Sequence, residues 1–118
     1  MNLIAEIERV LRKKKELEAK REQLLKELSE LKPEEGHLEY KPVKNKIGMT
    51  YYYWYLRIYE NGKLKSVYLG KEIPQAILKG IEDRRKAKKI NSELRAINRE
   101  LVKIERGLRE IENILSKL

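Results

Sequence analysis

Cysteine and phenylalanine are absent from this 118-residue chain, and histidine occurs only once, as His37. Without cysteine the chain has no disulfide, no thiolate metal ligand and no cysteine nucleophile. A single histidine is too few for a typical zinc site, so we expect His37 to be a solvated loop residue and the protein to bind no metal and no cofactor. No apolar run approaches ~20 residues and nothing reads as a cleavable leader, which predicts a cytoplasmic protein without a membrane span.

The motifs of the common enzyme classes are also missing. The chain has no glycine-rich phosphate loop and no Ser/His/Asp set. Paired acids such as Glu34-Glu35 are most simply solvated charges in a chain with 19 acidic residues. A tyrosine nucleophile between Tyr51 and Tyr59 would need an Arg/His/Lys cluster on a much larger domain. We therefore expect a protein that is not an enzyme.

What the chain has in abundance is charge. Charged residues make up 40% of the sequence, and leucine and isoleucine recur between them at regular spacing. This composition is typical of long charged helices rather than of disorder, and a chain without phenylalanine must arrange its apolar residues as stripes. The wealth of Lys, Glu and Ile also fits a protein from a hot environment.

Two segments repeat apolar residues every seven positions. The first repeat consists of Leu3, Val10, Leu17, Leu24 and Leu31. The second alternates isoleucine with leucine, a pattern that favours a parallel two-stranded coiled coil, and we expect it to mediate oligomerisation through Ile90, Leu94, Ile97, Leu101, Ile104, Leu108, Ile111 and Leu115. Gly80 and Gly107 weaken this helix by about 1 kcal/mol each, unless close packing uses the missing side chain.

Between Thr50 and Gly70 the chain gathers six of its seven tyrosines, its only tryptophan and an Asn61-Gly62 pair. Asn-Gly between two alternating runs is the strongest short-range signal for a β-hairpin, because a type I′ turn needs positive φ at both positions. With Glu60 opposite Lys63, alternation places on one face Trp54, Leu56, Ile58, Lys65, Val67 and Leu69. The other face then carries Tyr51, Tyr53, Tyr55, Arg57, Tyr59, Leu64, Ser66 and Tyr68.

Proline and glycine mark the ends of these segments. Pro33 and Gly36 end the first helix, and Pro74 is a good first-turn residue for the second. Residues 38–43 can add an edge strand, the position at which Pro42 is tolerated. The sequence thus predicts one structural unit of the α+β class, mainly α. It consists of a coiled-coil helix over residues 1–32, a two- to three-stranded antiparallel β head over 33–73, and a coiled-coil helix over 74–118 that packs antiparallel on the first.

The net charge of +9 is concentrated in the middle of the chain. Residues 32–89 carry fourteen basic and seven acidic side chains, whereas the flanking segments are nearly balanced. Basic residues interleaved with tyrosines supply phosphate neutralisation together with base stacking, so we expect nucleic acid, DNA rather than RNA, as the partner. The candidate contacts are Lys44, Lys46, Tyr53, Tyr55, Arg57, Tyr59, Lys65, Tyr68, Arg84 and Arg85.

Two other interpretations of these residues stay open. The tyrosines can instead dock a protein partner, as in an adaptor module, since rigid amphipathic rings are common hot spots. They can also be pure scaffold, because tyrosines are good strand formers and lysines protect exposed sheet edges. Independently, we expect a homodimer or a higher even oligomer, since one helix pair leaves uncovered Ile4, Leu11, Leu25, Val102 and Ile114.

The tyrosine segment also resembles a known family. The run Tyr51-Tyr52-Tyr53, the turn Glu60-Asn61-Gly62-Lys63, the return strand with Lys65-Ser66 and Tyr68, and the following Ile73-Pro74 are similar to the tyrosine-rich hairpin of an uncharacterised bacterial and archaeal domain family, often seen beside mobile elements. The resemblance covers Pro42 to Lys89. It implies a hairpin before a charged helix and a viral or mobile-element setting, with no activity to carry over. Many such members have cysteines ahead of the tyrosine run, which Val43 to Gly48 lack.

Overall fold

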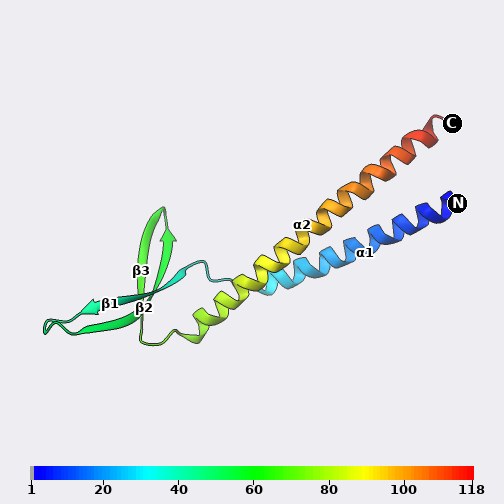
Figure 1. The fold of residues 1–118 in the computed structure, drawn as a ribbon. Helices are drawn as coiled ribbons and strands as arrows, with labels where there is room; N and C mark the ends of the chain where they lie inside the picture. The colour runs from blue at the N-terminus through cyan, green and yellow to red at the C-terminus, as the bar shows by residue number, and fades with distance from the viewer. Residues whose placement is uncertain (1) are drawn as a thin grey trace. The chain divides into compact units, whose positions relative to one another are not determined.

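A computed structural model describes residues 2–118 as two long helices and a three-stranded antiparallel sheet (Figure 1). In chain order the elements are α1 (Leu3–Glu30), β1 (His37–Lys44), β2 (Thr50–Glu60), β3 (Lys63–Gly70) and α2 (Gln75–Ser116). The predicted α+β class is confirmed, with the sheet inserted between the two helices in sequence. The described chain divides into two compact units. One contains the residues up to Leu31 together with Ala87–Leu118, and the other is Lys32–Lys86.

Local signals explain where α1 begins and ends. The side-chain oxygen of Asn2 accepts hydrogen bonds from the backbone N–H groups of Ile4 and Ala5, at 3.0 and 3.4 Å, and so caps the helix. At the other end Leu31 is already extended, and Pro33 follows two residues later. Within residues 2–118, neither helix contains an apolar stretch that is long enough to cross a bilayer.

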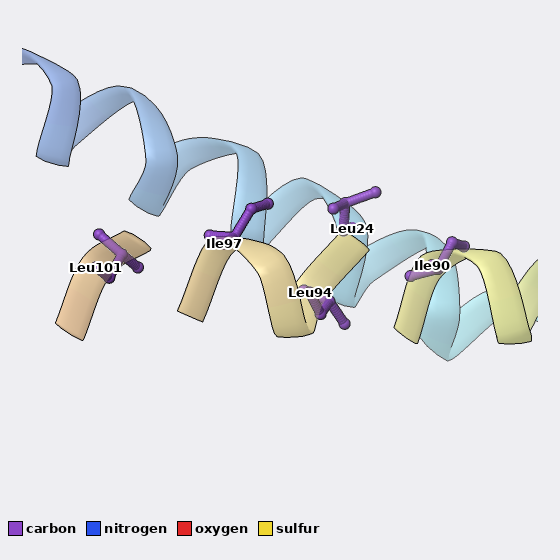
Figure 2. Close-up of a cluster of buried hydrophobic side chains, with 5 residues drawn as sticks. All are labelled: Leu24, Ile90, Leu94, Ile97 and Leu101. Atoms are coloured by element: carbon purple, nitrogen blue, oxygen red, sulfur yellow. The ribbon is translucent and has the colours of Figure 1, made fainter. Parts of the chain in front are cut away.

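The helical unit has a small apolar core, drawn in Figure 2. Its buried members are Leu24, Ile90, Leu94, Ile97 and Leu101, and Leu17, Leu28 and Leu31 pack against them. Polar contacts on its border give the direction of the helices. Lys13 pairs with Glu100 and Arg21 donates to Asn98, so a later residue of α1 meets an earlier residue of α2. The two helices therefore pack antiparallel within one chain, as predicted.

The leucines and isoleucines expected to mediate oligomerisation fall into two groups. Ile90, Leu94, Ile97 and Leu101 lie in the core with α1, so their burial requires no second chain. Ile104, Leu108 and Ile111 are half-buried, and Leu115 is exposed. The first half of this heptad pattern therefore packs against the antiparallel helix α1 of the same chain, although such a pattern favours a parallel coiled coil.

In the sheet, β2 is the central strand and β1 and β3 are the edges. Asn61 and Gly62 have φ values of 53° and 76°, which confirms the type I′ turn. The β2–β3 register runs as predicted from Glu60 opposite Lys63 to Tyr55 opposite Tyr68. The third strand is also confirmed, and Pro42 lies on the edge strand β1.

One prediction about this hairpin is wrong. Simple alternation would place Leu69 opposite Trp54, but Trp54 pairs with Gly70 across a β-bulge. Gly70 adopts a φ of 103°, which only glycine accepts without strain, and this lets β3 absorb the extra residue. Leu69 is therefore the extra residue of the bulge and has no direct partner on β2.

Gly80, in the part of α2 that belongs to the sheet-containing unit, is buried against the segment that leads into β1. The backbone N–H of Glu34 donates to the carbonyl of Gly80 at 2.9 Å. A Cβ added at Gly80 would lie 2.9 Å from the Cβ of Glu34 and 3.2 Å from its backbone nitrogen. Close packing thus uses the missing side chain, which offsets the helix-propensity cost of this glycine.

Replacing Gly80 with alanine should lower the free energy of unfolding by about 1 kcal/mol, because overpacking costs about 1–3 kcal/mol and the gain in helix propensity is only about 1 kcal/mol. Gly107→Ala is the matched control. Nothing lies within 4 Å of its added Cβ, so this variant should be more stable by about 1 kcal/mol. Urea unfolding followed by circular dichroism measures both, and equal effects at the two positions would contradict the packing at Gly80.

Candidate nucleic-acid interface

All four tyrosines expected to contact nucleic acid share one side of the sheet. We call this side the tyrosine face. Strand alternation and the observed register assign to it His37, Glu39, Lys41, Val43, Tyr51, Tyr53, Tyr55, Arg57, Tyr59, Leu64, Ser66 and Tyr68. The opposite side, the Trp54 face, contains Trp54, Leu56, Ile58, Lys65 and Val67, as predicted.

Three rings in the middle of the tyrosine face form a cluster. Tyr68 on β3 meets Tyr53 and Tyr55 on β2, with 5.6 Å between ring centroids in each pair and interplanar angles of 61° and 67°. Tyr51 extends the row, with its centroid 6.5 Å from that of Tyr53. Such edge-to-face pairs hold each ring in one orientation. Tyr68 nevertheless remains 59% exposed, so much of its surface is open to a ligand.

The charged side chains of this face are oriented by their neighbours. The ammonium of Lys41 lies 4.6 Å from the centroid of the Tyr55 ring, a cation–π contact. The Nε of Arg57 lies 3.3 Å from a carboxylate oxygen of Glu39. Both partners of this ion pair are partly exposed, so it contributes little to stability, and its main effect is to position the guanidinium.

A hollow opens at the end of the tyrosine face. It has a volume of about 230 Å³ and is lined by His37, Arg57, Tyr59 and Leu64. A second hollow, of about 480 Å³, shares the first three of these residues and extends to Pro33. His37 is exposed as expected, but it is not a loop residue. It begins β1 directly opposite Arg57, because the third strand starts earlier than the sequence suggested.

The Trp54 face holds aromatic contacts that the sequence interpretation missed. Tyr40 and Tyr52 stack with 5.3 Å between centroids, and Tyr40 also lies 4.7 Å from Trp54. The sequence signal that could have predicted these contacts lies in the turn between β1 and β2. The side chain of Asn45 accepts hydrogen bonds from two backbone N–H groups of this turn, and Gly48 has a φ of 87°. An Asn-to-Gly turn at this point sets Tyr40 opposite Trp54.

The predicted contact residues do not all lie together. The structure gathers on the tyrosine face Tyr53, Tyr55, Arg57, Tyr59 and Tyr68. Lys44 and Lys65 belong to the Trp54 face, where Lys65 pairs with Glu60 at 2.9 Å, and Lys46 is exposed in the turn after β1. In the described part of the chain no three acidic or histidine side chains are grouped as a metal site would require.

Arg84 has a structural role that its sequence neighbourhood did not reveal. Its Nη1 donates to the carbonyls of Glu34 and Gly36, at 2.7 and 2.6 Å. The adjacent Asp83 is only 5% exposed, and its carboxylate accepts the backbone N–H of Lys32 at 3.1 Å. Together these bonds satisfy the backbone of the segment before β1, so we leave Arg84 out of the candidate interface. Arg85 is exposed and remains in it.

The chain matches a protein family described as a domain of unknown function, DUF6788, over residues 14–77, which is more than half of its length. The chain belongs to this family. The match begins within α1, includes all three strands and ends in the first turn of α2. It therefore confirms an uncharacterised family that contains the tyrosine-rich hairpin, and it extends further toward the N-terminus than the predicted resemblance from Pro42 to Lys89. No curated protein and no solved structure matches the chain.

Arg84→Gln should lower the free energy of unfolding by about 1–3 kcal/mol, because two partly buried carbonyls lose their charged donor. Arg85→Gln, one residue further along α2, should change it by less than about 0.5 kcal/mol, as is usual for an exposed side chain. Urea denaturation of the two variants compares them directly. If Arg84→Gln left the stability unchanged but impaired binding to DNA, the structural role would be contradicted and Arg84 would be a candidate contact with DNA again.

Proposed function

We propose that the protein is a non-enzymatic nucleic-acid-binding protein that contacts DNA, in preference to RNA, through the tyrosine face, and that its helices carry a dimerisation surface. The observation that carries this proposal is that the tyrosine ring cluster and the excess of basic residues occur in the same segment of the chain. The segment with fourteen basic and seven acidic residues is the same segment that presents the ordered ring cluster.

The two features supply complementary parts of the binding energy. Cationic side chains near a nucleic acid release condensed counterions, which yields affinity without sequence preference. Exposed rings stack on bases, which is equally tolerant of sequence. Of the candidate phosphate contacts we keep Arg57, which lies on the tyrosine face, and the exposed Lys46 and Arg85, and the proposed ring contacts are Tyr53, Tyr55, Tyr59 and Tyr68. Lys44 and Lys65 lie on the Trp54 face and are left out. Weak or absent sequence specificity follows from both mechanisms.

A protein-docking role is the second candidate, and the Trp54 face supports it. Tyr40 and Tyr52 are 53% and 51% exposed although they stack on each other, and Ile47 in the neighbouring turn is 88% exposed. Exposed aromatic and aliphatic groups of this kind are typical anchors of protein interfaces. A viral or mobile-element setting and a hot habitat remain part of the proposal, on the resemblance of the hairpin and on composition.

The dimerisation part of the proposal rests on apolar residues that one chain leaves open. The stripe predicted to be uncovered is exposed in the structure, with exposed fractions of 47% for Leu11, 50% for Leu25 and 51% for Val102. A hollow of about 380 Å³ lies beside Val102 on α2. A second copy of the chain would bury these residues as a four-helix bundle does. Such a dimer would also present two tyrosine faces and raise the apparent affinity for a long nucleic acid.

Binding to nucleic acid should weaken as salt is added, and log Kd should rise linearly with the logarithm of the salt concentration, because released counterions drive association. Fluorescence anisotropy with labelled DNA and RNA between about 50 and 200 mM salt measures the slope. Arg57→Ala should reduce its magnitude by about 0.7–0.9, the value for one phosphate contact. Arg12→Ala, at an exposed arginine of the nearly balanced segment 1–31, serves as the control and should leave the slope unchanged. Absence of binding below about 10 μM at about 50 mM salt would refute the proposal in favour of protein docking.

Light scattering should find a mass near twice the 14.1 kDa of one chain. Val102→Glu should shift the protein toward the monomer, since it places a charge in the proposed apolar contact. Lys20→Glu introduces the same side chain at an exposed position of α1 that lies outside this hollow and should leave the mass unchanged. A concentration-independent monomer for the unmodified protein would contradict dimerisation.

A further inference from the structure

We infer that the tyrosine face is a platform for unpaired, single-stranded nucleic acid and does not read a duplex. This inference rests on the proposed function and names its substrate class. Three observations support it: the width of the sheet at the ring cluster, the kind of surface that the rings present, and the small number of cations on this face.

The first observation concerns the fit to a double helix. Tyr55 lies between Glu39 on β1 and Tyr68 on β3, so the ring cluster sits where the sheet is three strands wide. Neighbouring strands are about 4.8 Å apart, which separates the outer strands by about 10 Å before any side chain is added. The major groove is only about 12 Å wide and admits one helix or a two-stranded ribbon. The cluster therefore cannot reach base edges inside an intact duplex.

The second observation concerns what the cluster offers a ligand. Tyr53, Tyr55 and Tyr68 are held edge to face, so the cluster presents ring surface to a ligand in addition to its hydroxyl groups. In a duplex the faces of the bases are covered by their neighbours in the stack, whereas an unpaired strand can place its bases on aromatic side chains. Ring surface on a sheet is thus useful to a single strand and of little use to a double helix.

The third observation concerns charge. Within the described strands, Lys41 and Arg57 are the only lysine or arginine residues of the tyrosine face, and Glu39 offsets one of them. Duplex binding without base contacts depends on many phosphate contacts. Two cations supply too few phosphate contacts for a duplex, but they suffice for a short single strand whose bases also stack on the rings.

The hollow at the end of the cluster completes the platform. His37 and Arg57 lie side by side on neighbouring strands, and Tyr59 and Leu64 form the rest of the lining. The guanidinium suits a phosphate, and the exposed Tyr59 ring, together with the leucine, suits a base or sugar. The geometry corresponds to a strand that runs along the tyrosines and places one nucleotide beside Arg57.

The test compares three labelled probes of about 12 nucleotides: a single strand of thymidines, the same backbone with abasic positions, and a mixed-sequence duplex. Anisotropy should show the tightest binding for the thymidine strand. The abasic strand has the same number of phosphates but no bases to stack, so it should bind at least about 5-fold more weakly. The duplex should bind more weakly than the thymidine strand at equal salt.

Variants on the two faces of the sheet assign the effect to the tyrosine face. Tyr68→Leu should weaken binding of the thymidine strand at least about 5-fold, by the same factor at low and moderate salt, because stacking releases no counterion. Tyr52→Leu is the matched control, since Tyr52 has similar exposure on the opposite face. It should change affinity less than about 2-fold. Tyr68→Phe keeps the ring and should restore binding. Unchanged emission of Trp54, the only tryptophan, shows that the sheet remains folded in each variant.

The possible results separate this inference from the proposed function. Duplex binding as tight as single-strand binding, equal affinity for the abasic strand, or equal effects of Tyr68→Leu and Tyr52→Leu would each overturn the single-strand platform while nucleic-acid binding stands. Failure of all three probes to bind would overturn both.

Discussion

Cross-strand pairing of β2 with both of its neighbours is the constraint on which the candidate site depends. Because side chains alternate along a strand, the register of one residue pair decides the face of every other residue. The Asn61-Gly62 turn sets that register on one side, and the turn after Lys44 sets it on the other. A slip of β3 by one position would move Tyr68 to the Trp54 face and separate it from Tyr53, Tyr55 and Arg57.

A second constraint acts where the chain enters and leaves the sheet. The segment before β1 has no regular strand partner, and its backbone groups are instead bonded to α2 through Arg84, Asp83 and the carbonyl of Gly80. These hydrogen bonds compensate the backbone polar groups for the hydrogen bonds to water that they lose on burial, which would otherwise destabilise the fold. The same segment places Gly36 against Leu56 and Ile58, where an added Cβ would lie within 3 Å of both side chains. Two distant parts of the chain thereby hold the start of β1, and with it His37, next to Arg57.

Sequence reasoning succeeded where one local rule was strong. The Asn-Gly pair predicts the turn and most of the hairpin register, and the seven-residue spacing predicts both long helices. It failed where two local rules compete, and where a residue's role depends on a contact with residues far away in the sequence. The bulge at Leu69 depends on how β3 leaves the sheet through Gly70, which alternation alone does not describe. Arg84 lies in a basic run typical of a solvated helix, and only the approach of Glu34 and Gly36, about fifty positions earlier, makes it structural.

By itself the sequence determined the elements, their order, the alternation that puts most tyrosines on one face, and the central excess of positive charge. These are properties of neighbours within a few residues, for which local sterics and periodicity are sufficient. The tertiary structure alone decided that the sheet has three strands at Tyr55, that Lys44 lies away from the rings, and that half of the heptad residues are covered by α1. Each of these depends on contacts between residues far apart in the chain, whose free energy appears only once the segments have met.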